Sequence, residues 1–314
     1  MDVYLPLGVL DVRAAVRTPF KAQGIFVEMS TPFDHTGAIY RAKVEFNVAK
    51  WNLTTVSGYL AGGPAGEGPL LSAQDRASLW EWVRTASTLN SDKERMLIAG
   101  IDSPGVAEAT ALAEQADSRG FHAVAAMTPR FDRDHESRAE TQLLYYRSLA
   151  DRSRLPVLIH HQPRVTGVSL ATETLLDLAK HPNIAGTIGS GIDVRRLAAE
   201  ARKDFAILTG DETRLWSDLQ AGAAGAVLGV ASAIPYAAIA VWEAFRTREE
   251  EAGIDWQNRI LAPAELVTRQ FGPAGLKHAM DVNGYYGGPP RLPQSPLDAP
   301  AHEAIERAFQ TLKG

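Results

Sequence analysis

Short apolar runs rich in Val, Ile and Ala alternate along this chain with longer segments whose apolar residues recur at helical spacing. Such alternation predicts βα units whose strands form a sheet buried on both faces. Strands are predicted in eight places: IFVEMST from Ile25, GYLAG from Gly58, MLIAGI from Met96, HAVAAMT from His122, PVLIHH from Pro156, IAGTI from Ile184, FAILT from Phe205 and GAVLGVA from Gly225.

Helical patterns fill the intervening segments. In SAQDRASLWEWVRTA, Ser72 and Asp75 can cap the first turn, and ETQLLYYRSLAD from Glu140 has the same spacing of apolar residues. Eight such repeats favour an α/β fold, a closed (β/α)8 TIM barrel, over an open doubly wound sheet. No GxGxxG motif follows the first strand, so a dinucleotide-binding fold loses its main support.

The chain continues well beyond the eighth predicted strand. We expect a barrel over residues 1–235, with an N-terminal segment at 1–23, and a C-terminal helical extension over residues 236–314 packed on the barrel. Helical patterns occur in the extension at Tyr236–Glu251, Asp255–Phe271, Gly275–Val282 and Ala301–Leu312. The linker Gly287–Pro300 is rich in Pro, so we expect it to run extended and to serve packing rather than catalysis.

Composition narrows the class of protein further. The chain is 45% hydrophobic and 22% charged, as in an ordinary globular protein, and its net charge of -5 comes from interspersed acids and bases. Nothing here favours a nucleic acid or a membrane as partner. The absence of cysteine excludes disulfides and a cysteine nucleophile. We expect a cytoplasmic protein whose partners are a small carboxylate and copies of itself, with no cofactor.

Several motifs, in order along the chain, resemble a known family. They are STPFDHTG (Ser30–Gly37), GPAGEGPLLSAQDR (Gly63–Arg76), TPRF (Thr128–Phe131), HHQPRVTG (His160–Gly167), HPNIAG (His181–Gly186), LTGDE (Leu208–Glu212), GAAGAVLG (Gly222–Gly229) and FGPAGLKHAMDVNGYYGGPPRLP (Phe271–Pro293). Together they resemble the dihydrodipicolinate synthase and N-acetylneuraminate lyase family of class I aldolases, with a tail most similar to the 4-hydroxy-2-oxoglutarate aldolase branch. The resemblance implies a TIM barrel and a homotetramer or dimer.

The same resemblance implies an imine between a lysine on the sixth strand and a 2-oxo acid. The family pattern is similar to GxKDxSGD, whereas this chain reads GTIGSGID, which puts Ile188 at the lysine's position. Other family positions also differ: the tyrosine of the fifth strand falls on His160, the threonine pair on Pro64 and Ala65, the cross-subunit tyrosine on Phe131 and the aldehyde-binding arginine on Val165, beside Arg164. We therefore expect the imine mechanism, and literal synthase activity, to be absent.

No other lysine is a ready substitute. Lysines occur at positions 21, 43, 50, 93, 180, 203, 277 and 313, and none falls in a predicted strand or in a loop at the strands' carboxyl ends. Active sites of barrels are built at that end. The placement of the lysines therefore agrees with the resemblance.

Glu28 and His160 are the catalytic candidates. Glu28 interrupts an apolar strand, and a buried carboxyl group needs a partner or a raised pKa. The resemblance points His160 inward, so the two could form a pair that moves protons. The alternative is a structural hydrogen bond that fills the space left by the lysine. His161 alternates to the other side of its strand and is expected to be a satisfied histidine facing the helices.

Further residues are candidates for the substrate site. A metal held by Glu28, His160, Gln162 and Asp211 is conceivable, but no HExxH motif supports it, so no metal is expected. Asp211 is better placed to cap the next helix. The turn with Gly62, Gly63 and Gly66 could donate to an anion, although Pro64 removes one donor. The predicted substrate-binding residues are Pro64, Ala65, Gly66, Arg130, Gln162, Ile188, Ser190 and Asp211.

Two interpretations from different classes remain. The first is an enzyme of the lyase family that uses Glu28 and His160 as acid and base on a small 2-oxo or hydroxy carboxylate. The second is a barrel that binds a ligand or a partner subunit without chemistry. The fold cannot decide between them, because function depends on the site.

Overall fold

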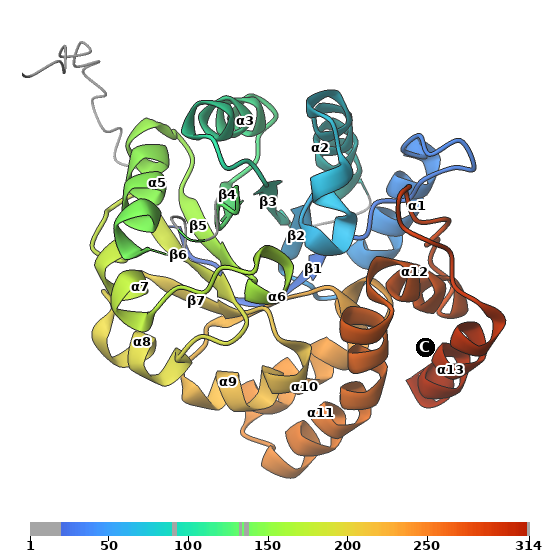
Figure 1. The fold of residues 1–314 in the computed structure, drawn as a ribbon. Helices are drawn as coiled ribbons and strands as arrows, with labels where there is room; N and C mark the ends of the chain where they lie inside the picture. Colours follow the sequence, from blue (N-terminus) through green and yellow to red (C-terminus); the bar gives the residue numbers. More distant parts are fainter. Residues whose placement is uncertain (1–19, 90–92, 132–133, 135–137, 313–314) are drawn as a thin grey trace, which may run out of the picture.

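The computed structural model describes residues 20–89, 93–131, 134 and 138–312, and its centre is a closed barrel of eight parallel strands (Figure 1). Each strand pairs with the next in sequence, and β8 pairs with β1. The strands are β1 (Gly24–Glu28), β2 (Gly58–Ala61), β3 (Met96–Ile101), β4 (Ala123–Met127), β5 (Val157–His161), β6 (Ile184–Gly189), β7 (Ala206–Thr209) and β8 (Gly225–Leu228). All eight predicted strands and the TIM-barrel fold are confirmed.

Helices surround the barrel as predicted. They are α1 (Arg41–Asn52), α2 (Ala73–Ser87), α3 (Val106–Ser118), α5 (Ala139–Arg152), α6 (Pro163–Thr166), α7 (Thr172–Leu178), α8 (Val194–Glu200), α9 (Leu215–Ala221) and α10 (Pro235–Thr247). The predicted cap of α2 is present, because the Asp75 amide donates to the Ser72 hydroxyl and the Ser72 amide donates to the Asp75 carboxylate. A cap of this kind stabilises a helix by about 1 kcal/mol.

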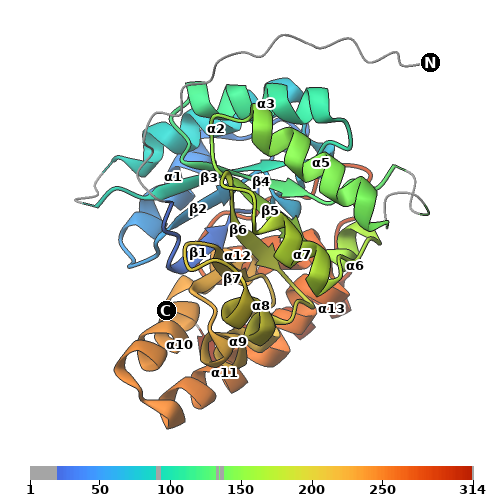
Figure 2. The ribbon, with the colours of Figure 1, turned by 90° about the vertical axis from the view of Figure 1, so that its left-hand side faces the viewer.

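The C-terminal extension is helical too. It contains α11 (Glu250–Ala264), the π-helix η5 (Glu265–Gln270), α12 (Gly272–Val282) and α13 (Ala299–Phe309). Figure 2 shows α10 and α11 projecting beyond the barrel on one side. The predicted linker has no regular structure before α13 begins, and Arg291 anchors it through hydrogen bonds to Gly37, Leu70 and Asp75.

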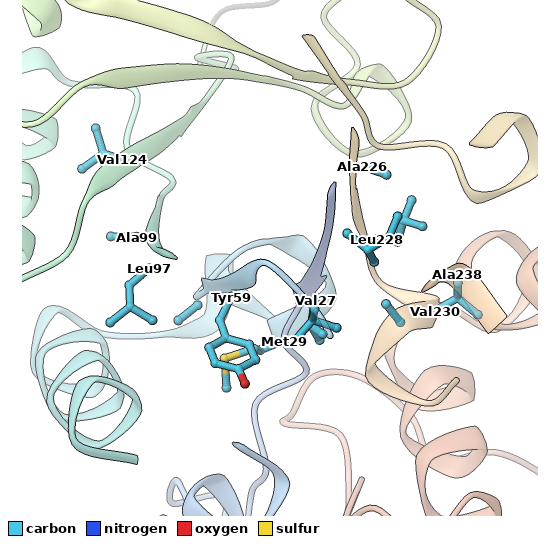
Figure 3. Close-up of a cluster of buried hydrophobic side chains, with 14 of the residues drawn as sticks. Val27, Met29, Tyr59, Leu97, Ala99, Val124, Ala226, Leu228, Val230 and Ala238 are labelled. Atoms are coloured by element: carbon cyan, nitrogen blue, oxygen red, sulfur yellow. The ribbon is translucent and has the colours of Figure 1, made fainter. Parts of the chain in front are cut away.

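Two layers of apolar side chains stabilise the barrel. Alternate residues of each strand point inward, and the inner layer includes Phe26, Leu60 and Ile188. The residues between them face the helices, and part of this outer layer is shown in Figure 3. Each fully buried side chain of this size stabilises the fold by about 1.5–3 kcal/mol. Since Phe26 points inward, Glu28 two residues later points inward at the carboxyl end of β1.

Among the described residues, every helix is too short or too polar to cross a bilayer.

Candidate active site

A cavity of about 500 Å³ opens at the carboxyl ends of the strands. This is the end at which barrel enzymes carry their active sites. It is lined by Glu28, Pro64, Ala65, Glu67, Pro69, Leu70, Gln162, Pro163, Arg164, Val165, Ser190, Gly191, Gly210, Asp211, Glu212, Gly229, Val267, Thr268, Arg269, Gly272, Pro273, Leu276 and Gln294. The barrel loops therefore supply one part of the wall, and the C-terminal extension supplies the rest.

Glu28 reaches the floor of this cavity from the end of β1. Its side chain is almost fully buried, and its Oε1 accepts a hydrogen bond of 3.1 Å from the Ala65 amide. Burial raises the pKa of Glu28 to about 8; the Ala65 hydrogen bond opposes this and the negative charge of Glu212 adds to it. The neutral acid is therefore the main form of Glu28 at pH 7.

Two amides of the turn that carries Ala65 already donate within the protein. The Gly66 amide donates to the Gly63 carbonyl, and the Ala65 amide donates to Glu28. A Cβ atom on Gly63 would lie 2.5 Å from the Glu28 Oε1, so a side chain there would displace the Glu28 carboxyl group. This turn was a candidate anion site, but the chain's own carboxyl group occupies the Ala65 donor.

Glu212 is a second buried carboxyl group of the same cavity. It follows β7, and its Oε1 accepts hydrogen bonds from the amides of Gly229 at 3.0 Å and Val230 at 3.4 Å. Burial raises the pKa of Glu212 to about 7. The sequence interpretation missed Glu212, although its place directly after a predicted strand, beside Asp211, was a usable signal.

Both carboxyl groups can hold or release a proton near neutral pH. Burial raises the pKa of Glu28 to about 8 and that of Glu212 to about 7. Carboxyl groups whose pKa values lie near the operating pH are efficient general acids and bases. The arrangement is chemically suited to proton transfer.

His160 does not belong to this arrangement. It faces the barrel interior from β5 and is fully buried, but it does not line the cavity. Neither ring nitrogen has a hydrogen-bond partner within the described residues, and the expected pair with Glu28 is therefore not formed. Burial lowers the pKa of His160 to about 4, an effect that the nearby Asp102 only partly offsets, so the ring is neutral at pH 7.

Three predicted substrate-binding residues lie away from the cavity. Ile188 packs in the inner apolar layer of the barrel, and the Gly66 amide is used within its own turn. Arg130 holds the Asp102 carboxylate with both terminal nitrogens, the Nη2 contact being 2.7 Å. Each of these residues is therefore engaged in structure. Part of the loop that follows Arg130 lies outside the described residues.

The other predicted substrate-binding residues do line the cavity. The Ser190 hydroxyl donates to the side-chain Oε1 of Gln162 at 3.0 Å, and these two side chains form a polar edge of the cavity. Asp211 accepts from the Thr213 amide, as expected of a cap, and it also binds Arg269 of the extension at 3.2 Å. Pro64 and Ala65 complete the set.

His161 has the satisfied position that alternation predicts. Its Nε2 accepts a hydrogen bond from the Leu170 amide at 3.0 Å, and its Nδ1 lies 3.0 Å from the Ser190 carbonyl oxygen. Both ring nitrogens are used, so the histidine is structural.

Lysine is absent from the described lining of the cavity. The nearest case is Lys277 of α12, whose fully buried Nζ lies 2.7 Å from Glu67 and donates to the carbonyls of Thr31 at 2.8 Å and Pro289 at 2.9 Å. Two hydrogen bonds and one ion pair therefore hold this amine. Burial lowers the pKa of Lys277, but Glu67 opposes this shift. The sequence interpretation did not find this pair, because its members are far apart in the chain.

Metal-binding groups do not converge anywhere in the described ranges, since no three His, Asp or Glu side chains there are placed to share an ion. The four residues considered for a metal are instead separated. Glu28 and Asp211 line the cavity with Gln162, whereas His160 does not.

Comparisons with known proteins agree with the fold. The model of the dihydrodipicolinate synthetase family matches residues 21–312. An uncharacterized DapA-like lyase of Halobacterium salinarum is 30% identical over 96% of this chain and 93% of its own length. A 4-hydroxy-tetrahydrodipicolinate synthase of Exiguobacterium sp. is 26% identical over 91% of this chain and 97% of its own.

Among solved structures, dihydrodipicolinate synthase DapA-2 of Bacillus anthracis superposes with a TM-score of 0.86. It covers 93% of this chain and 99% of its own at 23% identity. Similarity at that level supports the fold and leaves the chemistry to the residues of the cavity.

Proposed function

This chain belongs to the dihydrodipicolinate synthetase family, and from that premise we propose that it acts as a lyase-like enzyme on a small 2-oxo or hydroxy carboxylate by proton transfer, without an imine. The observation that carries the proposal is the presence of two buried carboxyl groups, Glu28 and Glu212, in one cavity. The resemblance of the tail to the 4-hydroxy-2-oxoglutarate aldolase branch makes 2-oxo acids the first ligands to test.

The absence of a lysine amine from the described lining of the cavity supports a mechanism without an imine. By resemblance the nucleophilic lysine falls on Ile188, which packs in the inner layer. None of the described lysines lines the cavity, and the buried Lys277 is held by Glu67. An ion pair with a carboxylate favours the protonated amine, which has no lone pair to offer a ketone.

Glu28 and Glu212 supply the acid and the base. Protonated Glu28 donates to the ketone oxygen of the substrate, while ionised Glu212 removes a proton from the neighbouring carbon. A C–H bond breaks, its electron pair forms the C=C bond of an enol, and the Glu28 proton completes the enol hydroxyl. Reversal of the step, after Glu212 has exchanged its proton with water, returns the acid with a solvent proton on carbon.

Arg164 is the best-placed group for the substrate carboxylate. It lines the cavity from α6, is exposed, and makes no ion pair with the described residues. The other cavity arginine, Arg269, is held by Asp211. Arginine binds carboxylates with two parallel hydrogen bonds, which fixes their orientation.

Proton exchange in D₂O tests the proposal directly. We expect the C3 proton signals of a 2-oxo acid to disappear from its NMR spectrum with wild-type protein at pH 7, and to persist with Glu28→Gln. Ligand binding without any exchange would favour the alternative of a non-catalytic binding barrel.

Borohydride trapping tests the imine-free mechanism. With pyruvate and borohydride, the mass of the protein is expected to stay unchanged. A pyruvyl adduct on any lysine would refute the imine-free mechanism and restore ordinary aldolase chemistry.

A further inference from the structure

The cavity is larger than a three-carbon acid requires. Its volume is about 500 Å³, within the range of pockets that bind small organic ligands. Cavities of this size enclose ligands as large as typical drugs. A short oxo acid bound at the carboxyl groups would therefore leave most of the space unfilled.

Part of the cavity wall is apolar. Leu70 and Pro69 line it from the loop after β2, and Pro273 and Leu276 line it from α12. A Cβ atom on Gly229 would lie 3.5 Å from the Glu212 Oε1 and 3.8 Å from the Leu276 Cδ2. The apolar wall therefore begins next to the reacting carboxyl groups.

A π-helix presents part of this wall. Three consecutive residues of η5, Val267–Arg269, line the cavity. The π-helix is rare in proteins and occurs frequently at functional sites. Its occurrence at the cavity, in the extension rather than in the barrel, marks the extension as part of the binding surface.

We propose that the ligand of this cavity is a 2-oxo or 2-hydroxy acid with an apolar substituent several carbons long, held by the extension and the loop after β2. This inference rests on the proposed function and names its substrate class. The acid end lies at Arg164 and the carboxyl groups, since the Ala65 amide is already taken by Glu28. The apolar substituent lies against Leu70, Pro273 and Leu276.

Calorimetric titration with straight-chain 2-oxo acids, from pyruvate to 2-oxooctanoate, tests the substrate class. The Kd is expected to fall by about two- to fourfold per added methylene group, as burial of each group in an apolar site requires. A Kd that stays constant or rises with chain length would overturn the inference. The amide of the longest acid, which lacks the charge, is expected to bind at least tenfold more weakly.

Matched variants locate the substituent. Leu70→Ser is expected to weaken binding of 2-oxooctanoate severalfold and to leave that of pyruvate within twofold. Leu144→Ser removes an apolar side chain of α5 that is 69% exposed and lies away from the cavity, so it should change neither Kd. Equal Kd values for Leu70→Ser and wild type with the longest acid would contradict the proposed placement.

Failure of this inference is distinguishable from failure of the proposed function. A flat Kd series together with proton exchange that depends on Glu28 would refute the apolar substituent and keep the proton-transfer mechanism. A steep series without exchange for any acid would refute the mechanism and keep the ligand class. Absence of binding by every acid would overturn both.

Discussion

Glu28 and His160 both point into the barrel near the carboxyl ends of their strands, yet only Glu28 lines the cavity. On the cavity side, carboxyl groups accept backbone hydrogen bonds and face open space. Away from the cavity, the His160 ring nitrogens have no hydrogen-bond partner in the described part of the chain. Ile188, beside His160 on β6, packs in the apolar interior of the barrel. Of these two buried ionisable side chains, only Glu28 can therefore meet a ligand bound in the cavity.

Glu28→Gln is expected to have the largest effect. The amide keeps the shape and the hydrogen bond from Ala65 but holds no transferable proton, so proton exchange of 2-oxo acids should slow by about 10²–10⁴-fold. The rate follows from NMR spectra at several times. If the folded variant exchanged protons at a rate within threefold of wild type, Glu28 would not be the acid catalyst.

Two ion pairs that differ in burial should differ in their contribution to stability. Lys277→Met leaves Glu67 buried and unpaired, so the free energy of unfolding should fall by about 3–5 kcal/mol. Arg130→Gln breaks a pair whose arginine side chain is 31% exposed, so the loss should be about 1–2 kcal/mol. Urea denaturation measures both, and equal losses would contradict the distinction.

The pH dependence of stability offers a third test. The pKa of Glu28 is raised from 4.5 to about 8, so its neutral form is favoured by folding. The folded state then binds more protons than the unfolded state between these values, and stability falls as pH rises from 4.5 to 8, by at most about 1.4 kcal/mol per pH unit. Glu212, whose pKa is raised to about 7, adds a slope of the same sign below pH 7. Glu28→Gln should therefore make the slope smaller below pH 7 and remove it between pH 7 and 8, as measured in urea titrations at successive pH values. A slope of stability against pH that is unchanged from wild type would mean that the raised pKa belongs to another group.

His160→Leu should have the smallest effect on exchange, within about threefold, because the ring does not reach the cavity. Its pKa is lowered from 6.5 to about 4, so its contribution to stability is present above pH 6.5 and is lost as pH falls toward 4. The variant should therefore resist acid better than wild type in thermal unfolding at pH 5. A loss of exchange comparable to that of Glu28→Gln would restore the predicted catalytic pair.

Local patterns were sufficient to predict the barrel. Runs such as MLIAGI are apolar at every position, which only strands buried on both faces require, and β3 occupies that run. The Ser72 cap could likewise be predicted from the sequence, since its partner Asp75 lies three residues away. Both features depend on short-range sequence, where spacing determines geometry.

The site could be predicted only in part. Glu28 was found because it interrupts an apolar strand, but inward direction alone does not determine how near two side chains on β1 and β5 approach, so the predicted pairing with His160 was wrong. Glu212 was overlooked beside Asp211, whose capping role was correctly predicted. The Lys277–Glu67 pair joins residues that are distant in sequence, and no local pattern signals such a contact.

The protonation state of Glu28 in the cavity is the central claim, and infrared difference spectroscopy measures it most directly. The spectrum of wild-type protein minus Glu28→Gln at pH 7 should contain the C=O stretching band of a protonated carboxylic acid, and the band should give way to carboxylate bands as pH rises through about 8. Carboxylate bands already present at pH 7, with no acid band, would contradict the account.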